Sequence, residues 1–422
     1  MGDSVLSVLG RTQKGRGMTD TATVYNPFES GFAEDPYPQY EALRDVDPVH
    51  QSPFGMWALF AYDDVLRFLR DFELSVDERF AHPTPMTELV QSVVGDEADR
   101  GGYAMLNRDP PDHTRLRRLV SKAFTPRMIE ALSPRIRQLV DQSLDSVADR
   151  GESDLIRDLA FPLPFQVISE LLGIPETGTD QLREWTGLLV RTLEPVYDPD
   201  VLRAIAEAGR SMVELTKEFI NWKRCNLSDD LLSGLIAAEE NGDVLSEDEL
   251  ADQVLLLYIA GHETTVNLIG NGTLALLRHR SELEHLQGDP SLVPNAIEEL
   301  LRFDSPVQMT RRITLAEVGI GGKTIEPGAF VLLMLGSANH DAQHWGDHAD
   351  KLDVTRVDAK THVSFGGGHH LCLGAALACL EAQAAIGTLI SRFPDLELAD
   401  EPHWNGRINL RGLSQLPVHL SR

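Results

Sequence analysis

Long segments with the apolar spacing of helices dominate the chain. The longest begins with a capping box, in which Ser246 is followed three residues later by Glu249, and it lacks proline until Pro290. Its middle, residues 254–260, is almost wholly apolar, as expected of a helix buried in the core. A helix of about thirty residues or more extends about 45 to 50 Å at 1.5 Å per residue. The pattern therefore predicts a central helix that crosses the whole molecule.

Shorter segments predict further helices and a few strands. Residues 373–392 are rich in Ala and Leu and lack Pro, which predicts a long buried helix. Helical spacing also occurs, interrupted by prolines in places, at residues 39–44, 63–72, 154–240 and 295–303. Strand-like segments are short and lie at residues 49–61, 318–321, 329–334 and 404–420. The predicted fold class is mainly α with small β-sheets.

Length and composition favour one large domain. The 422 residues are 42% hydrophobic, which is ample for a sizeable core. The sequence has no Pro/Gly/Ser-rich linker and no internal repeat that would separate domains. We therefore predict a disordered N-terminal extension at residues 1–25 and a single domain at residues 26–422. Met18 is an alternative natural start.

The charge excludes several classes of partner. With 38 basic and 65 acidic residues the net charge is −27, which argues against nucleic acid and anionic membrane surfaces. No apolar run approaches the 18 or so residues of a membrane span. Cys225, Cys372 and Cys379 are too few for a disulfide framework and fit a reducing compartment. We expect a cytoplasmic monomer.

The segment with the clearest chemistry, residues 365–374, reads Phe-Gly-Gly-Gly-His-His-Leu-Cys-Leu-Gly and is called the Cys loop below. Its glycines permit positive φ and leave room for a flat group. Cys372 stands at the start of a predicted helix, whose dipole and amide N–H groups stabilise a thiolate. Haem iron with an axial Cys is the preferred interpretation. Gly374 would then let the helix pack on a porphyrin, and His370 would reach a carboxylate.

Two other interpretations of the Cys loop stay open at this point. A Gly-rich turn before a buried helix is often only a turn, and Cys is often a core residue. A structural zinc site is conceivable from four side chains, but neither C-x-x-C nor H-x-x-x-H spacing supports it; the four are His369, His370, Cys372 and Cys379.

The Cys loop resembles the haem-binding signature F-G-x-G-x-H-x-C-x-G of the cytochrome P-450 family and matches it at every fixed position. The resemblance implies that the cofactor is haem b, iron protoporphyrin IX. It also implies that Cys372 is the proximal thiolate ligand of the iron and that His370 contacts a haem propionate. Phe365 and Gly374 are implied to complete this part of the haem site.

A basic region lies at residues 108–137. Residues 108–137 hold eight basic and three acidic residues, a local charge of +5. His113 and Arg117 are spaced i, i+4 and share a helix face, where they can hold a carboxylate. A charge run is usually a solvated face. The family's H-x-x-x-R segment implies instead that both residues contact a haem propionate and that exposed arginines dock an electron donor. Farther along, Arg312 best matches another propionate ligand, with Arg311 as the alternative.

The central helix is interrupted by Gly261-His-Glu-Thr-Thr265. Gly costs about 1 kcal/mol against Ala in a helix, and Thr can bond back to the carbonyl four residues earlier, so the interruption indicates function. A zinc-peptidase H-E-x-x-H motif is excluded because Val266 occupies its last position. The segment resembles the family's A/G-G-x-D/E-T-T/S motif. This implies that Gly261 borders the haem, that Thr264 holds dioxygen by a hydrogen bond, and that Glu263 relays protons.

One further resemblance is structural. Glu299 and Arg302 match the family's E-x-x-R element, and Arg356 matches its third member. All three are predicted to support the Cys loop.

Together these motifs imply a soluble bacterial-type cytochrome P-450 with its long central helix over the haem. It would hydroxylate or epoxidise an apolar small organic substrate with O2, because the thiolate favours O–O cleavage. The chain carries no flavin or iron–sulfur segment, so electrons would come from NAD(P)H through a ferredoxin reductase and a ferredoxin. A peroxide-driven peroxygenase and a non-catalytic haem sensor are the alternatives, and neither needs Glu263 and Thr264.

Overall fold

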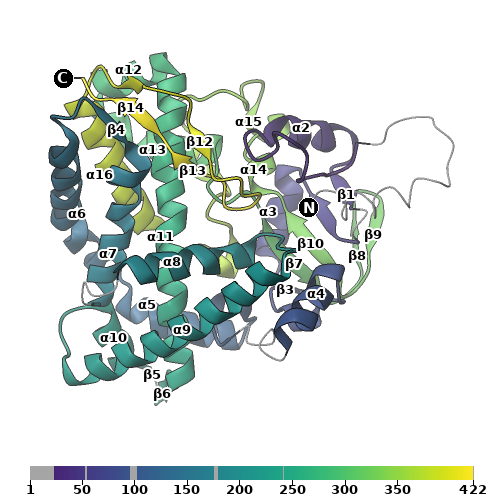
Figure 1. Ribbon diagram of the computed structural model, residues 1–422. Helices are drawn as coiled ribbons and strands as arrows, with labels where there is room; N and C mark the ends of the chain where they lie inside the picture. Colours follow the sequence, from purple (N-terminus) through teal and green to yellow (C-terminus); the bar gives the residue numbers. More distant parts are fainter. Residues whose placement is uncertain (1–22, 53–54, 96–101, 175–178, 241, 422) are drawn as a thin grey trace.

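The computed structural model describes residues 23–52, 55–95, 102–174, 179–240 and 242–421, and these residues are the subject of all that follows. The predicted N-terminal extension and the alternative start at Met18 fall almost entirely outside them. Helices fill one part of the molecule and the largest sheet lies in the other (Figure 1). This arrangement confirms the predicted fold class, mainly α with small sheets.

The helices include those predicted at residues 39–44, 63–72, 295–303 and 373–392, with ends that differ by a few residues, while the predicted helical region 154–240 is divided among several of them. They are α2 (Tyr37–Val46), α3 (Tyr62–Arg70), α4 (Pro85–Val94), α5 (Asp112–Ala123), α6 (Pro126–Val147), α7 (Pro162–Leu172), α8 (Thr179–Leu189), α9 (Pro199–Cys225), α10 (Leu231–Ala237), α11 (Glu247–Arg278), α12 (Arg280–Gly288), α13 (Val293–Phe303), α14 (Leu335–Ala338), α15 (Ala342–Trp345) and α16 (Ala375–Arg392). Two short helices of other types are used below, the π-helix η4 (Ile156–Ala160) and the 3-10 helix η5 (Val190–Leu193).

The strands form one five-stranded sheet and several smaller ones. They are β1 (Val49–Gln51), β2 (Trp57–Leu59), β3 (Leu74–Ser75), β4 (Glu152–Asp154), β5 (Glu239–Glu240), β6 (Asp243–Val244), β7 (Thr310–Thr314), β8 (Val318–Ile320), β9 (Lys323–Ile325), β10 (Phe330–Leu333), β11 (Glu397–Leu398), β12 (His403–Trp404), β13 (Leu413–Gln415) and β14 (Pro417–His419).

Strands that are distant in sequence pair within the sheets. The large sheet has the order β1-β2-β10-β7-β3, in which β2 and β10 are parallel and the other pairs antiparallel. A three-stranded sheet has the order β11-β14-β4. The two predicted strands at 318–321 and 329–334 both exist, but β8 pairs with β9 whereas β10 joins the large sheet.

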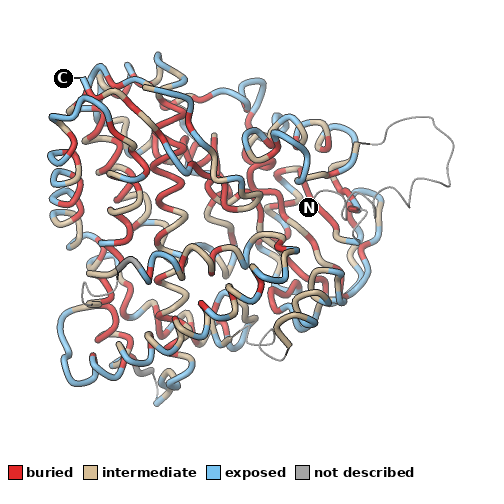
Figure 2. Tube along the Cα trace, viewed as in Figure 1, coloured by how far each residue is buried: buried red, intermediate tan, exposed pale blue. Residues whose placement is uncertain are grey.

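The predicted central helix is α11, which runs the length of the helical part (Figure 1). Its 32 residues extend about 48 Å. It begins with the predicted capping box, in which Ser246 and Glu249 each bond the other's backbone N–H. The proline-free run is divided at His279, where α11 ends and α12 starts. Buried residues follow α11 and the sheet, whereas exposed residues lie along the outer helices (Figure 2).

A buried ion pair joins α13 to the segment that leads to the Cys loop. The guanidinium of Arg302 donates to both carboxylate oxygens of Glu299, over 2.7 and 2.8 Å, and both side chains have no exposed surface. Arg302 also donates to the carbonyls of Asn339 and Ala349. The Arg356 Nε lies 3.1 Å from Glu299 Oε2. Glu299 therefore contacts both arginines of the predicted triad.

Candidate functional site

The Cys loop is a tight turn packed on α3. The amide N–H of Cys372 donates to the Phe365 carbonyl over 3.0 Å and closes the loop. Gly366 and Gly368 have φ of +72° and +64°, values that favour glycine. At Gly368 a side chain would also collide with the carbonyl oxygen of Leu69. The glycines are therefore needed for the shape of the turn itself.

Cys372 lies before the following helix instead of opening it. Helix α16 begins at Ala375 with Gly374 as its N-cap, and a Cβ added at Gly374 would meet no atom of the described residues within 4 Å. Although Cys372 is exposed on one side, burial raises the pKa of its thiol, and the N–H of Gly374, the charge of Arg117 and the N–H of Ala375 oppose this effect. The predicted N–H groups are present, but they do not outweigh burial. A metal cation would supply the charge that removes the proton.

Three imidazoles gather between α5 and the Cys loop. The ring centroid of His113 lies 4.2 Å from that of His370 and 5.2 Å from that of His369. Phe72 stacks on His369 at 5.1 Å. Burial lowers the pKa of His113 to about 4 and that of His370 further still, with the neighbouring histidines and Arg117 adding to the effect. The imidazoles are therefore neutral at pH 7 and carry one N–H donor each.

Two arginines connect this cluster to α5 and to the large sheet. Arg117 donates to the Leu371 carbonyl over 2.6 Å, so it and His113, one turn apart, both contact the Cys loop. Arg312 on β7 is buried, and its charge is felt by His369 and His370. Burial lowers the pKa of Arg312 to about 10, which leaves it charged at neutral pH.

The neighbouring Arg311 is directed elsewhere. Its guanidinium lies 2.5 Å from the Glu78 carboxylate, and its side chain is partly exposed. Its backbone carbonyl accepts a hydrogen bond from Arg312 over 2.7 Å. The two side chains of the doublet therefore have different surroundings, and only that of Arg312 acts on the imidazole cluster.

The cluster contains several buried nitrogens without a hydrogen-bond partner. Within the described part of the chain, no group pairs with either ring nitrogen of His113 or His369, with Nε2 of His370 or with Nε of Arg312. Buried donors without acceptors are costly, so this arrangement fits an anionic group with several oxygens, such as the propionates of haem. The zinc alternative gains no support, because the described residues contain no group of three or more His, Cys, Asp and Glu placed to hold a metal ion.

The middle of α11 has the predicted polar interruption. Thr264 Oγ1 donates to the Ala260 carbonyl over 2.9 Å, and Thr265 Oγ1 does the same to Gly261 over 3.3 Å. Ala260 is exposed although it lies at the centre of a core helix. A Cβ at Gly261 would lie 3.4 Å from the Ile168 side chain of α7, so this face of the glycine is directed toward α7.

The partner of Glu263 was missed by the sequence analysis. Its carboxylate pairs with the guanidinium of Arg407, and both side chains are largely buried. Arg407 lies between β12 and β13, in a segment with no recognisable motif. Glu194, immediately after η5, was also missed, and it accepts hydrogen bonds from backbone N–H groups near Arg407. The one signal in the sequence that could have pointed to a role for Arg407 is its positive charge within the strand-like segment predicted at residues 404–420.

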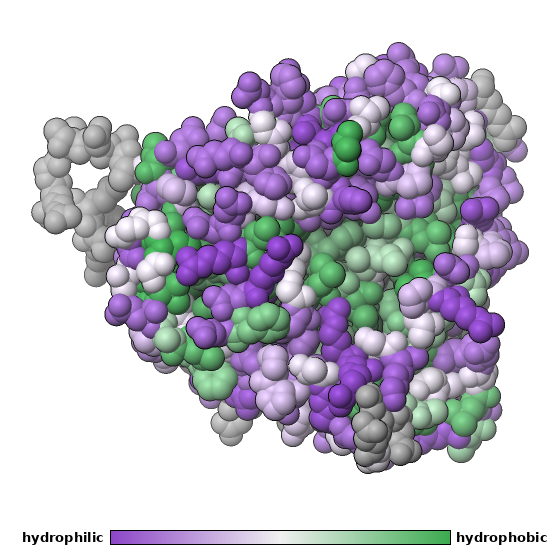
Figure 3. All heavy atoms as spheres, turned by 180° about the vertical axis from the view of Figure 1, so that it is seen from behind, coloured by the Kyte–Doolittle hydropathy of each residue, from purple (hydrophilic) through white to green (hydrophobic). Residues whose placement is uncertain are grey.

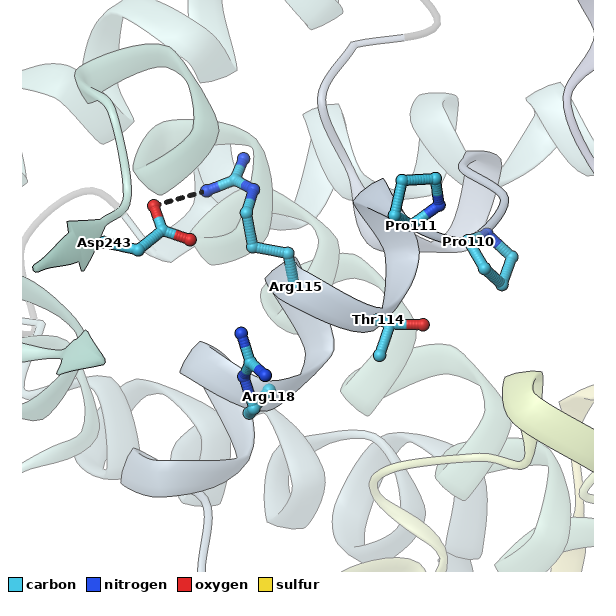
Figure 4. Close-up of a pocket in the computed structure, with 6 residues that line it drawn as sticks. All are labelled: Pro110, Pro111, Thr114, Arg115, Arg118 and Asp243. Atoms are coloured by element: carbon cyan, nitrogen blue, oxygen red, sulfur yellow. Dashed lines mark hydrogen bonds and ion pairs between the residues drawn. The ribbon is translucent and has the colours of Figure 1, made fainter. Parts of the chain in front are cut away.

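The basic region of α5 is partly paired. Arg115 contacts Glu249 and Asp243, while Arg118 is exposed on the same helix (Figure 4). An open hollow of about 560 Å³ is lined by Arg115, Arg118 and Asp243 together with Pro110, Pro111 and Thr114. The positive charge that the sequence predicts for Arg115 is therefore largely neutralised by its neighbours.

Hydrophobic side chains also gather on the reverse face of the molecule. Figure 3 shows them in a hollow bordered by hydrophilic residues. Among the described residues, no helix has the length and apolar character needed to cross a bilayer.

Comparisons with known proteins show which family the chain resembles. The family model for cytochrome P-450 matches residues 188–404. Cytochrome P-450 107B1 of Saccharopolyspora erythraea is 45% identical over 406 residues, which cover 93% of this chain and 96% of that protein. Vitamin D(3) 25-hydroxylase of Pseudonocardia autotrophica is 43% identical, with 95% and 98% covered. The solved structure of the Bacillus subtilis bacillaene polyketide synthase cytochrome P-450 PksS superposes with a TM-score of 0.85 at 38% identity, with 94% and 100% covered. The chain therefore belongs to the cytochrome P-450 family of haem-binding monooxygenases.

Proposed function

We propose that this monooxygenase hydroxylates or epoxidises an apolar small organic molecule, using O2 and electrons from NAD(P)H that pass through a reductase and a ferredoxin. The observation that carries the proposal is the acid and alcohol pair, Glu263 and Thr264, in the middle of α11 beside the exposed Ala260. We assign the whole reaction to a single catalytic domain, residues 26–422.

The apolar substrate is supported by the side chains around this pair. Helix α11 presents partly exposed aliphatic residues immediately before it, namely Leu255, Leu256, Leu257 and Ile259. One relative is named as a vitamin D(3) 25-hydroxylase, and a second is named for a polyketide synthase. Vitamin D(3) and polyketides have large, mostly apolar carbon skeletons. A spin-state titration against sterols, fatty acids, terpenoids and polyketide lactones would identify the substrate. A response only to small charged molecules would contradict the apolar assignment.

Haem, when bound, would supply the iron that activates O2, and a thiolate ligand would favour cleavage of the O–O bond. Cys372 would provide the thiolate, and the N–H groups of Gly374 and Ala375 would stabilise it. The donors of His113, His370 and Arg312 would hold the propionates, while Phe365 and Gly261 would border the ring. The unpartnered buried N–H groups of this cluster support the assignment.

Arg312 should contribute more to haem retention than Arg311. Arg312→Leu removes a buried, charged donor from the propionate cluster, so we expect haem to dissociate roughly 10- to 100-fold faster, as for the loss of a charge-assisted hydrogen bond. Arg311→Leu is the matched control, because that guanidinium pairs with Glu78. Transfer of haem to an excess of an apo haem-scavenging protein measures the rate. Equal rates for the two variants would show that the assignment of Arg312 is wrong.

Thr264 and Glu263 are proposed to manage protons at the oxygen-binding side. The Thr264 hydroxyl donates to the Ala260 carbonyl and can turn to a ligand. Glu263 is the preceding residue, and its carboxylate pairs with Arg407. In these roles Thr264 would hold dioxygen by a hydrogen bond and Glu263 would pass protons from solvent.

Thr264→Ala tests this role directly. We expect NAD(P)H and O2 consumption to continue while product per NAD(P)H falls by at least roughly tenfold, since a positioned proton donor contributes that much or more. Thr265→Ala removes the adjacent, buried hydroxyl and should leave the product ratio close to that of the natural enzyme. Product formation that stays fully coupled in Thr264→Ala would exclude the proton role. A peroxygenase would instead form product from peroxide alone, and a haem sensor would form none in either assay.

The ferredoxin is proposed to dock over α5. The region is basic in an acidic protein, and Arg117 of this helix contacts the carbonyl next to Cys372, so a partner bound here lies near the thiolate. Arg115→Glu and Arg118→Glu should each slow reduction by ferredoxin at low salt, because each change reverses a positive charge of this basic region. Unchanged reduction rates in both variants, measured by stopped flow, would place the docking site elsewhere.

A further inference from the structure

The segment between β12 and β13, residues 405–412, lies along α11 and is called the C-terminal loop here. Glu263, Asn267 and Asn271 are spaced by four residues and so form one stripe on α11. Each contacts the loop: Arg407 donates to Glu263, Asn267 to the carbonyl of residue 410 over 3.5 Å, and Asn271 to that of residue 411 over 3.1 Å. The acid is therefore one end of a continuous contact between helix and loop.

The same loop binds the end of the α8–η5 segment. The Glu194 carboxylate accepts hydrogen bonds from three consecutive backbone N–H groups, those of Ile408, Asn409 and Leu410, over 2.8 to 3.2 Å. The Asn409 side chain also donates to the Leu193 carbonyl over 3.3 Å. Hydrogen bonds to a carboxylate are stronger than neutral ones, so Glu194 fixes the loop by its charge.

Internal hydrogen bonds link the two ends of the loop. Asn405 Oδ1 accepts from the N–H of Arg407 over 3.0 Å, and Asn405 Nδ2 donates to the Leu410 carbonyl over 2.9 Å. At Gly412 a side chain would collide with that of Asn267, so the loop also presses closely on α11. A shift of the N–H groups that bind Glu194 is therefore transmitted to the backbone that carries Arg407.

We infer that Arg407 is a positioning residue for Glu263, and that Glu194 holds Arg407 in place from the α8–η5 segment. The inference rests on the proposed role of Glu263 in proton transfer. While Glu194 binds the loop, the guanidinium of Arg407 fixes the orientation of the Glu263 carboxylate. Without the Glu194 carboxylate, the three N–H groups of Ile408, Asn409 and Leu410 lose their acceptor and the Glu263 carboxylate loses its fixed orientation. The position of the α8–η5 segment thereby governs how efficiently O2 reduction is coupled to product formation.

The experiment uses the haem-loaded enzyme with the substrate found by spin-state titration, and it compares single and paired variants. Arg407→Gln should lower product per NAD(P)H severalfold with little change in KM, and Arg407→Lys should recover most of that loss. Glu194→Gln should lower the ratio similarly. The double variant should be no worse than Arg407→Gln alone, because both changes act on the same carboxylate.

Hydrogen–deuterium exchange supplies a readout that does not depend on turnover. In Glu194→Gln the amides of residues 408–410 should exchange roughly tenfold faster, because each loses a charged acceptor. Glu184→Gln, an exposed acid on α8, is the matched control and should alter neither exchange nor product ratio. Faster exchange in Glu194→Gln with an unchanged product ratio would overturn the coupling of this segment to Glu263.

Glu263→Gln separates the failure of this inference from failure of the proposed function. If that variant keeps the full product ratio, the proton role of Glu263 is wrong. If it lowers the ratio but Arg407→Gln does not, the proton role stands and the positioning role of Arg407 is wrong.

Discussion

Replacing Cys372 with alanine is expected to abolish turnover and the strongly red-shifted Soret band of the dithionite-reduced protein with carbon monoxide. The thiolate of Cys372 is the ligand that this band reports, and no other Cys of the described residues lies in the Cys loop. Haem can still be held in part by the donors of His113 and Arg312, so a residual, unshifted haem spectrum is compatible with the assignment.

Cys379→Ala is the matched control for this experiment. Its sulfur lies on α16 and faces a carboxylate oxygen of Glu298 at 3.9 Å, and burial raises the pKa of its thiol to about 12. A thiol in these surroundings is a core residue, so the variant should keep both the red-shifted band and turnover. Persistence of that band in Cys372→Ala would show that the axial ligand has been assigned to the wrong residue.

Arg302→Met is expected to cause the largest loss of folding stability, about 3–5 kcal/mol, because it leaves the carboxylate of Glu299 buried with an incomplete set of partners. It also removes the hydrogen bonds that Arg302 donates to the carbonyls of Asn339 and Ala349. Urea titration of the haem-loaded protein measures the free energy of unfolding.

Arg203→Met breaks an ion pair of the same i, i+3 spacing on the surface of α9, where Asp200 is its partner. Because both side chains are mostly exposed, we expect a loss of at most about 1 kcal/mol. If Arg302→Met unfolded at the same urea concentration as Arg203→Met, the buried triad would have no special structural role. A variant of Arg302 that yields no folded protein, beside a folded Arg302→Lys, would support it.

Local sequence patterns predicted the elements and motifs that depend on residues close together in the sequence. The capping box of Ser246 and Glu249, the back-bonded Thr264 and the pair His113 and Arg117 all depend on spacings of three or four residues, which the helix period fixes. Helix ends were less predictable: α16 starts at Ala375 because the Cys loop needs the preceding residues for its turn.

Contacts across long separations were beyond such patterns. Arg407 and Glu194 have no motif, and they meet Glu263 and the C-terminal loop only because β12 and β13 return the chain along α11. The direction in which the pKa of the Cys372 thiol shifts was likewise not predictable. Burial of the thiol outweighs the N–H groups that oppose it, and this burial depends on the surrounding fold and not on the sequence of the loop.

The sheet order constrains how the protein matures during synthesis. Strand β4 pairs with β14, so residues 152–154 cannot pair until residues 417–419 have been synthesised. Almost the whole remaining length of the chain separates the two strands. The large sheet is similarly split, with β1 to β3 made early and β7 and β10 much later. Such non-local pairing is slow because long loops must close first. Helices can form while the ribosome is still at work, but a nascent chain that stops before β14 leaves an edge of β4 unpaired and available to other chains.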